Sequence, residues 1–235
     1  ESGNLLLEHC ERILEDYKRL EYEMHLLHNE YTGGLKLGAS TTIAQYVLPP
    51  LLASFIGKFP QVSLSLLNGN SREIEAALQE HRIDLGFVEG VFRLPNIRYT
   101  TFLEDELVAV VRTGSKLAVG EEITPDELFH LPLVLRERGS GTLDVFERAL
   151  QQHNIKLSSL QVLMYLGSTE SIKLFLEHTD CLGIVSVRSI TRELYSGQLR
   201  VVEIKGMPML RDFSFAQPQG QESGLAQVFM QFAMH

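Results

Sequence analysis

The sequence predicts an α/β fold of two similar lobes, joined by two crossover strands and preceded by a long helix. Three observations lead to this prediction. The first 31 residues carry an apolar repeat of heptad spacing, without Gly or Pro between Asn4 and Tyr31. Strand and helix patterns then alternate over residues 35–88, and the same alternation returns over residues 133–185. Such successions of strand, helix and strand predict parallel sheets with helices on their faces.

The composition is that of a globular protein and excludes several function classes. Of the 235 residues, 44% are hydrophobic and 22% are charged, and the formal net charge is −9. An acidic chain lacks the basic surface that nucleic acid requires, so we do not expect this chain itself to bind DNA. We expect no membrane association, because no apolar run reaches membrane-spanning length and no signal peptide is recognised. The chain begins with Glu1 rather than Met, so we expect it to be a piece of a longer protein.

The spacing of cysteine and histidine residues predicts neither a metal site nor a cofactor. Cys10 and Cys181 lie far apart, so two reduced thiols are favoured, while a redox-sensing pair stays open as the alternative. The eight His residues are dispersed and do not show the paired spacing of metal ligands.

Residues 1–31 are predicted to form a long helix with a narrow apolar stripe. The stripe residues follow one another at alternating spacings of four and three, which is the heptad period of a coiled coil. They are Leu6, Cys10, Ile13, Tyr17, Leu20, Met24, Leu27 and Tyr31. Two interpretations stay open: the helix pairs with its copy in a second chain, or it folds back on its own domain. The narrowness of the stripe favours pairing, which makes this segment a predicted dimerisation helix.

The first lobe begins after Gly33-Gly34, which ends the leading helix as a hinge or C-cap. The expected elements are a strand at 35–39, a helix at 44–58, a strand at 62–67, a helix at 71–81 and a strand at 83–88. Pro49-Pro50 falls near the first turns of the first helix, where missing N–H groups cost least. In parallel sheets ligands bind beyond the carboxyl ends of the strands. Those ends are residues 40–42, 68–71 and 89–90.

The second lobe lies between two predicted crossovers. Strands are expected at 99–103 and 106–111, and the acidic break at Glu104-Asp105 between them is the predicted first crossover. The further elements are a strand at 133–136, a helix at 143–153, a strand at 161–166, a helix at 168–178, and strands at 182–185 and 199–204. Residues 205–209 are the predicted return crossover, followed by an extended stretch at 209–216 and a helix at 222–234 that packs back on the first lobe. The lobes are therefore expected to comprise 34–104 plus 209–235, and 105–208, with a cleft between them.

Several motifs, in order and at matching spacing over about 200 residues, resemble the regulatory half of LysR-type transcriptional regulators. They are Gly34-Leu35-Lys36-Leu37-Gly38-Ala39-Ser40-Thr41-Thr42, Leu48-Pro49-Pro50-Leu51-Leu52-Ala53-Ser54-Phe55, Phe59-Pro60-Gln61-Val62, Asn68-Gly69-Asn70-Ser71, Ile83-Asp84-Leu85-Gly86 and Gly167-Ser168-Thr169-Glu170-Ser171-Ile172-Lys173. The leading helix, residues 1–31, looks like the linker helix of that family.

The resemblance implies two Rossmann-like lobes of the periplasmic-binding-protein type that bind a small-molecule effector. It implies a winged helix-turn-helix preceding Glu1 that binds promoter DNA. It also implies a cytoplasmic bacterial regulator that assembles as a homotetramer, with linker helices paired and regulatory domains docked antiparallel. An enzyme is not expected.

The first wall of the expected ligand site consists of Ser40, Thr41 and Thr42. One of these hydroxyls is expected to cap the following helix, but three exceed what one cap needs. The family's ligand-binding corner falls at this position, so we expect Ser40, Thr41 and Thr42 to contact the ligand. Asn70 and Ser71 either meet the ligand or cap the next helix. Glu89 either reaches the cleft, to bind an amine or to pair with Arg138, or lies at the surface.

The second wall is the segment from Arg136 to Thr142, where Gly139 and Gly141 allow close backbone approach before a helix. We expect Arg138, Ser140 and Thr142 to contact the ligand; the alternative is a tight strand-to-helix turn. In a subgroup of the family this turn reads Arg-Glu-Pro-Gly-Ser-Gly-Thr-Arg, whereas here Arg138 replaces the Pro. Thr169, at the start of a later helix, is expected to add one contact beside a cap.

Three functions stay open at this point. The favoured one is the effector-sensing domain of a transcriptional regulator, with a small anion or carboxylate, or an amino-acid-like compound, as ligand. A solute-binding protein of the same fold would need an export signal and no coiled coil, and the stripe of residues 6–31 argues against it. An enzyme is disfavoured because the sequence shows no nucleophile–base pair, no metal set and no phosphate loop with Lys.

Overall fold

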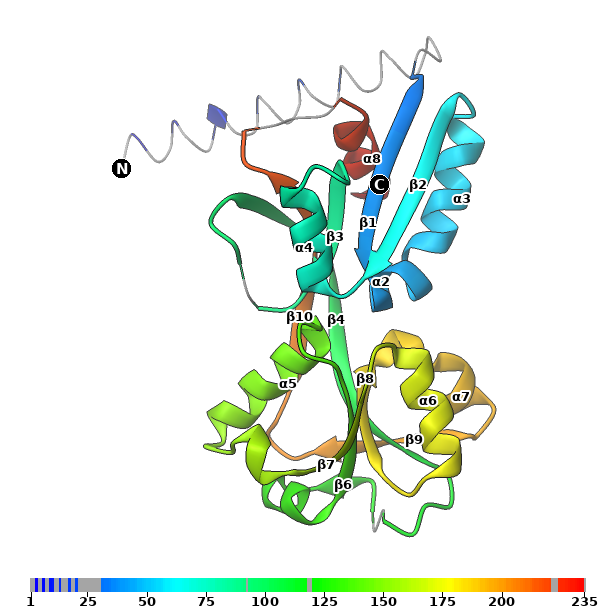
Figure 1. Ribbon diagram of the computed structural model, residues 1–235, viewed down its shortest axis with the longest axis vertical. Helices are drawn as coiled ribbons and strands as arrows, with labels where there is room; N and C mark the ends of the chain where they lie inside the picture. Colours follow the sequence, from blue (N-terminus) through cyan, green and yellow to red (C-terminus); the bar gives the residue numbers. More distant parts are fainter. Residues whose placement is uncertain are drawn as a thin grey trace.

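The structure is a computed structural model, which describes residues 3, 6, 9, 10, 13, 17, 20, 31–91, 93–117, 120–220 and 224–234. These residues form two lobes stacked along the long axis, and two long strands run from one lobe into the other (Figure 1). The predicted class, an α/β fold of two lobes joined by two crossover strands, is confirmed.

One sheet passes through both lobes, in the strand order β2-β1-β3-β10-β4-β8-β6-β7, while β9 pairs with β4 and β5. Lobe I contains β1 (Gly33–Ser40), β2 (Val62–Gly69) and β3 (Leu85–Glu89). Lobe II contains β5 (Glu122–Ile123), β6 (Pro132–Arg136), β7 (Gln161–Leu166), β8 (Leu182–Ser186) and β9 (Leu199–Ile204). β1 is parallel to β2 and β3, and β6 is parallel to β7 and β8, as the alternation of strands and helices predicts.

The crossovers are β4 (Ile97–Arg112) and β10 (Met209–Pro218), which pair antiparallel along the whole of β10. The prediction of two strands broken at Glu104-Asp105 is wrong, because β4 continues through both residues. Asp105 is buried inside a strand since its register partner on β10 is Arg211, which neutralises it. The return to lobe I is made by β10 itself rather than by residues 205–209, and Met209 still belongs to the core of lobe II.

The helices cover the faces of the sheet in both lobes (Figure 1). They are α2 (Thr41–Tyr46), α3 (Leu48–Lys58), α4 (Ser71–Gln79), α5 (Gly141–Gln152), α6 (Thr169–His178), α7 (Thr191–Tyr195) and α8 (Gly224–Met234), with short 3-10 helices η1 (Pro125–His130), η2 (Leu157–Ser159) and η3 (Val187–Ser189). The single helix predicted at 44–58 is two helices. They meet at Val47, because the prolines at 49 and 50 provide no N–H groups to continue the α2 ladder and instead occupy the first turn of α3.

The core of lobe I is rich in phenylalanine and includes the C-terminal helix. Phe55 of α3 lies against Phe229 of α8, with ring centroids 4.8 Å apart, and Phe87 of β3 packs on both Phe215 and Phe229. Burial of one such side chain contributes about 2–3 kcal/mol relative to exposure. The prediction that the last helix returns to the first lobe is therefore confirmed.

The described residues up to Leu20 are helical, and their apolar side chains lie in solvent. Leu6, Ile13, Tyr17 and Leu20 are 56–65% exposed and Cys10 is exposed, so this part of the stripe does not fold back on the lobes. Met24 and Leu27 lie outside the described residues. Tyr31 differs from the rest of the stripe: its ring packs edge-on against Phe59 in the lobe I core, at 5.5 Å between centroids, so it is not a free stripe residue.

Candidate functional site

Buried polar side chains collect where the two lobes meet. Lobe I supplies the end of β1 and the start of α2, together with the end of β3. Lobe II supplies the end of β6 and the starts of α5 and α6. The buried polar residues at these positions are Ser40, Thr41, Thr42, Ser71, Glu89, Arg136, Ser140, Thr142 and Thr169, joined by Arg211 of β10. The carboxyl ends of both sets of parallel strands therefore face one another across the lobe boundary.

Arg136, at the end of β6, is 1% exposed, and its side chain is among the largest fully buried ones of the described residues. Its Nη2 donates to Thr41 Oγ1 of lobe I at 3.3 Å, and its Nη1 donates to Thr169 Oγ1 at 3.5 Å. Half of its guanidinium is paired with Glu137, through Nε at 2.9 Å and Nη2 at 3.1 Å. Nη2 also donates to the carbonyl of Gly167, at 3.4 Å. Nη1, with one bond at 3.5 Å, is therefore the loosely satisfied part of the cation and is able to meet an anion more closely.

Ser40 and Thr41 are not consumed by helix capping. Ser40 occupies the N-cap position of α2, yet its side chain makes no capping bond, and its buried Oγ has no hydrogen-bond partner among the described residues. Thr41 donates its hydroxyl proton to the carbonyl of Gly69 at 3.2 Å while it accepts from Arg136. A buried hydroxyl without a partner costs about 1–3 kcal/mol, and a polar ligand atom beside Ser40 Oγ would remove that cost.

Glu89, at the end of β3, is buried at the same boundary. Its Oε1 accepts from Thr42 at 3.3 Å and from Thr142 at 3.5 Å, and its Oε2 lies 3.2 Å from Arg211 Nη2, within ion-pair distance but outside hydrogen-bond geometry. Ser71 fixes the backbone here, since its Oγ donates to the Glu89 carbonyl at 2.8 Å and accepts from the Glu89 N–H. Of the alternatives that the sequence left open for Glu89, a surface position and pairing with Arg138 are wrong, because Glu89 is buried and the cation beside it is Arg211.

The lobes touch directly at Glu89. A Cβ on Gly141 would lie 2.2 Å from the Glu89 carbonyl oxygen, so only glycine allows the start of α5 to approach β3 this closely. The backbone N–H of Arg72 in lobe I also donates to the carbonyl of Gly139 in lobe II, at 3.3 Å. The glycines of the predicted second wall, Gly139 and Gly141, therefore allow the backbone of lobe II to lie close to lobe I.

A second charged group lies across the boundary, between α2 and α6. The hydroxyl of Tyr46 donates to Glu170, and buried Lys173 contacts Glu170 at 2.7 Å and Glu193 at 2.8 Å. Burial, then the hydrogen bond to Glu170, raises the pKa of Tyr46 above its ordinary value, so this phenol stays a donor. Although partial burial opposes it, hydrogen bonds from Lys173 and Tyr46 keep the pKa of Glu170 below its ordinary value.

Two predicted residues have structural roles, and a third lies outside the buried group. Asn70 caps α4 in a capping box with Glu73, and Ser140 caps α5 by accepting from the Thr142 N–H. Arg138 is exposed, beyond the end of β6, so it does not join the buried group; the cation there is Arg136.

Sequence reasoning missed Arg136 and Arg211 as functional candidates. A charged residue closing an otherwise apolar strand was the available signal for Arg136. Nothing local marks Arg211, whose burial depends on its pairing with β4.

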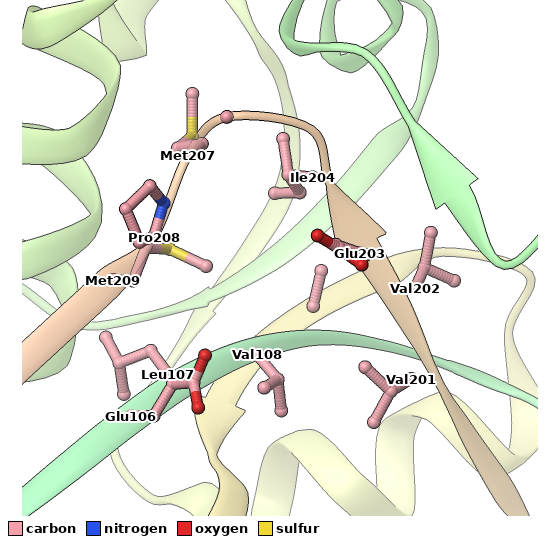
Figure 2. A pocket seen from close by; sticks show the side chains of 12 residues that line it. Glu106, Leu107, Val108, Val201, Val202, Glu203, Ile204, Met207, Pro208 and Met209 are labelled. Carbon is pink, nitrogen blue, oxygen red and sulfur yellow. The ribbon is translucent and has the colours of Figure 1, made fainter.

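A pocket of about 440 Å³ lies in lobe II, apart from this group of residues (Figure 2). It is lined by β4, by β9 and by the turn between β9 and β10, with the carboxylates of Glu106 and Glu203 among its lining side chains. Two carboxylates repel an anion, so this pocket is a poor place for the anionic ligand that the sequence predicts. Among the described residues, no group of three His, Cys, Asp or Glu side chains could hold a metal ion, and no helix is long and apolar enough to span a membrane.

The family model described as LysR substrate binding domain matches residues 28–235. The chain belongs to this family. The HTH-type transcriptional regulator YeiE of Escherichia coli strain K12 is 34% identical to the chain over 204 residues, which are 87% of this chain and 67% of that protein. The LysR domain described here therefore spans about two thirds of the length of that relative.

Solved structures agree with this assignment. The regulatory domain of CcmR from Synechocystis PCC6803, in complex with 2-PG, matches with a TM-score of 0.77 and 28% identity, over 86% of this chain and 96% of that one. Full-length CbnR in complex with its target DNA matches with a TM-score of 0.70 and 19% identity, over 99% of this chain and 81% of that one, which shows a shared fold. The chain is the effector-binding domain of a LysR-type transcriptional regulator, with the periplasmic-binding-protein-like fold.

Proposed function

We propose that this LysR domain binds a small anion between its lobes, at Arg136 and the hydroxyls of Ser40, Thr41 and Thr169. The single observation that carries the proposal is the fully buried Arg136, whose guanidinium touches hydroxyls of both lobes through long bonds. A planar guanidinium recognises carboxylate and phosphate groups through paired hydrogen bonds. An anion held there would contact both lobes and so favour the closed arrangement over an open one.

The chemistry of the neighbours suggests where to begin the search for the ligand. CcmR, at 28% identity, is the neighbour whose structure contains 2-PG, so 2-PG is the first compound to test, beside inorganic phosphate and sulfate. Arg136 favours an anion, whereas Arg211 is already paired with Asp105 and Glu89. Glu89 is already engaged with Arg211 and two threonines, so the amine-binding role that the sequence left open for Glu89 lacks support.

Calorimetry on matched variants tests this site. Arg136→Gln removes the buried cation, and Arg138→Gln removes an exposed cation two residues along the same chain, with the same change of net charge. Loss of one charge-assisted pair should weaken binding of the responding anion about tenfold or more in Arg136→Gln, while Arg138→Gln should match the parent. Equal affinities in the parent and in Arg136→Gln would place the ligand elsewhere.

We further propose that the domain assembles with copies of itself through two kinds of surface. The first is the exposed apolar stripe of the leading helix, at Leu6, Ile13, Tyr17 and Leu20. The second is formed by the two outermost strands of the sheet, β2 and β7, whose edges and neighbouring helices carry exposed apolar side chains. These are Ile56, Leu66 and Leu67 in lobe I, and Leu163, Met164, Tyr165 and Leu174 in lobe II.

Antiparallel docking would set lobe I of one copy against lobe II of the next, so that a twofold axis covers both edges at once. In sedimentation, Leu163→Glu should form a smaller oligomer than the parent, because the added charge disrupts the contact at β7. Leu210→Glu, which places the same charge on a residue that is 70% exposed on β10, should leave assembly unchanged. A parent that stays monomeric at high concentration would contradict both surfaces.

In the full-length regulator, we propose, a winged helix-turn-helix outside this chain binds promoter DNA in the cytoplasm, and the anion acts on it through the leading helices. The shared fold with the CbnR–DNA complex supports this arrangement. The effector must bind the closed and open states with different affinity if it is to alter DNA binding. Footprinting of the full-length protein with and without the anion tests the coupling. An anion that binds but leaves the footprint and transcription unchanged would contradict it.

A further inference from the structure

The carboxylate of Glu89 is surrounded by three side chains, those of Thr42, Thr142 and Arg211. Thr42 of lobe I and Thr142 of lobe II both donate to Oε1 of Glu89, and Arg211 of β10 lies 3.2 Å from Oε2. The side chains of Glu89 and Arg211 are 1% and 0% exposed, so this contact is shielded from water. Two hydroxyl donors and one guanidinium around a single carboxylate are the groups with which a protein binds a carboxylate ligand. We call these three residues the acid corner.

Two members of the acid corner, Arg211 and Thr142, are held by bonds that do not involve Glu89, and Thr42 is positioned by the first turn of α2. Arg211 is held by Asp105, through Nε at 2.8 Å and Nη2 at 2.7 Å, and Ser186 donates to the other oxygen of Asp105 at 2.7 Å. Arg211 Nη1 donates to Thr142 Oγ1 at 3.0 Å, which fixes that hydroxyl. The contacts of Glu89 are longer, at 3.2–3.5 Å. Glu89 is therefore the loosest member of the group, and its removal should leave the other three side chains in place.

We propose that the acid corner is a carboxylate-binding subsite that Glu89 fills in place of a ligand. Thr42 and Thr142 belong to opposite lobes, so a carboxylate in the corner links the lobes, as an effector would. By occupying the acid corner with its own negative charge, Glu89 directs an effector anion to Arg136 and excludes a second carboxylate beside Thr42. This consequence for effector choice rests on the proposed function, whereas the existence of the subsite does not.

Acetate is the probe that matches the subsite. Glu89→Ala removes Cγ, Cδ and the two carboxylate oxygens, and these are the four heavy atoms of acetate. Acetate that enters the vacated position would restore the contacts with Thr42, Thr142 and Arg211. A ligand that binds the folded state alone raises its stability in proportion to the logarithm of its concentration above the dissociation constant.

Thermal melting of the 235-residue chain in sodium acetate and in sodium chloride of equal ionic strength tests the proposal. In Glu89→Ala, acetate at about ten times its dissociation constant should raise the melting temperature by about 3–5 °C beyond its effect on the parent. Glu89→Gln fills the same volume and should respond to acetate as the parent does. Adding Thr42→Val to Glu89→Ala removes one donor and should reduce the shift. An acetate effect on Glu89→Ala no larger than that on the parent would overturn the proposal.

Two further measurements cover the cases in which Glu89→Ala does not fold or in which the effector site is wrong. If Glu89→Ala is unfolded in chloride, folding in acetate supports the subsite, and an unfolded chain in both buffers contradicts it. The double variant Glu89→Ala/Arg136→Gln separates the two sites, because it should lose effector binding and keep the acetate shift. An effector site that fails at Arg136 while acetate still stabilises Glu89→Ala would refute the proposed function and leave the acid corner standing.

Discussion

Gly141→Ala offers a sharp test of the contact between the lobes. The added Cβ would lie 2.2 Å from the carbonyl oxygen of Glu89, 2.5 Å from its carbonyl carbon and 2.7 Å from its Cγ. Two of these three atoms are backbone, so no side-chain rotation relieves the clash, and the start of α5 must move away from β3. Gly141 does not have a positive φ angle, so alanine is allowed by the backbone and the predicted effect is purely one of contact.

The magnitude follows from two opposing effects of the added methyl group. Overpacking of a closely fitted contact costs about 1–3 kcal/mol. Alanine in place of glycine returns up to about 1 kcal/mol of helix stability, and less at the first turn. The closed arrangement should therefore lose about 1–2 kcal/mol, which is about a 5- to 30-fold loss of anion affinity. The same loss of stability should lower the melting temperature of Gly141→Ala by about 2–8 °C for a chain of this size.

The assay combines thermal melting with small-angle scattering, since separated lobes increase the radius of gyration. Gly57→Ala is the matched control, because it lies in helix α3 with no atom within 4 Å of its added Cβ. This variant should melt at or above the temperature of the parent and scatter identically. If Gly141→Ala matches the parent in melting, scattering and anion binding, the contact between Gly141 and Glu89 does not hold the lobes together.

Two further predictions follow from the ionisable groups. Because hydrogen bonds from Lys173 and Tyr46 lower the pKa of Glu170 below its ordinary value of 4.5, the unfolded chain binds the extra proton first as pH falls. The stabilisation from Glu170 is thus complete above pH 4.5 and is lost as pH falls through the pKa of the folded state. The melting temperature of the parent should therefore fall over this pH range, and that of Glu170→Gln should lack this fall. The same pH profile in both proteins would contradict the stabilising role of Glu170. Burial raises the pKa of the Cys181 thiol to about 11, whereas Cys10 is exposed. Iodoacetamide at pH 8 should therefore modify Cys10 while the native Cys181 stays unmodified by mass spectrometry, and equal modification would contradict the burial of Cys181.

Most of the element order could be predicted from the sequence, because the hydrophobic pattern of each strand and helix lies within its own residues. The strand at 161–166 and the strand at 199–204 have the same bounds in the sequence pattern and in the structure. The misassigned stretches are those whose structure depends on residues far away in the sequence. Asp105 reads as a break in a strand until Arg211 is placed beside it by the pairing of β4 with β10.

The same reason limits the prediction of the site. Hydroxyl residues at strand ends could be identified, and Ser40, Thr41, Thr42, Thr142 and Thr169 do lie buried at the lobe boundary. Which arginine turns inward could not be identified, because the buried Arg136 and the exposed Arg138 lie only two residues apart, at the end of β6 and just beyond it. Thr42 and Thr142 were expected to meet a ligand, yet they meet Glu89, which only the contact between the lobes reveals.

The most direct test of anion binding between the lobes is the position of the bound anion in a crystal of the chain grown with the compound that gives the largest calorimetric response. If the anion binds between the lobes, its electron density lies within hydrogen-bond distance of Ser40 Oγ and the guanidinium of Arg136. Density in the lobe II pocket beside Glu106 and Glu203, with none between Ser40 and Arg136, would contradict it.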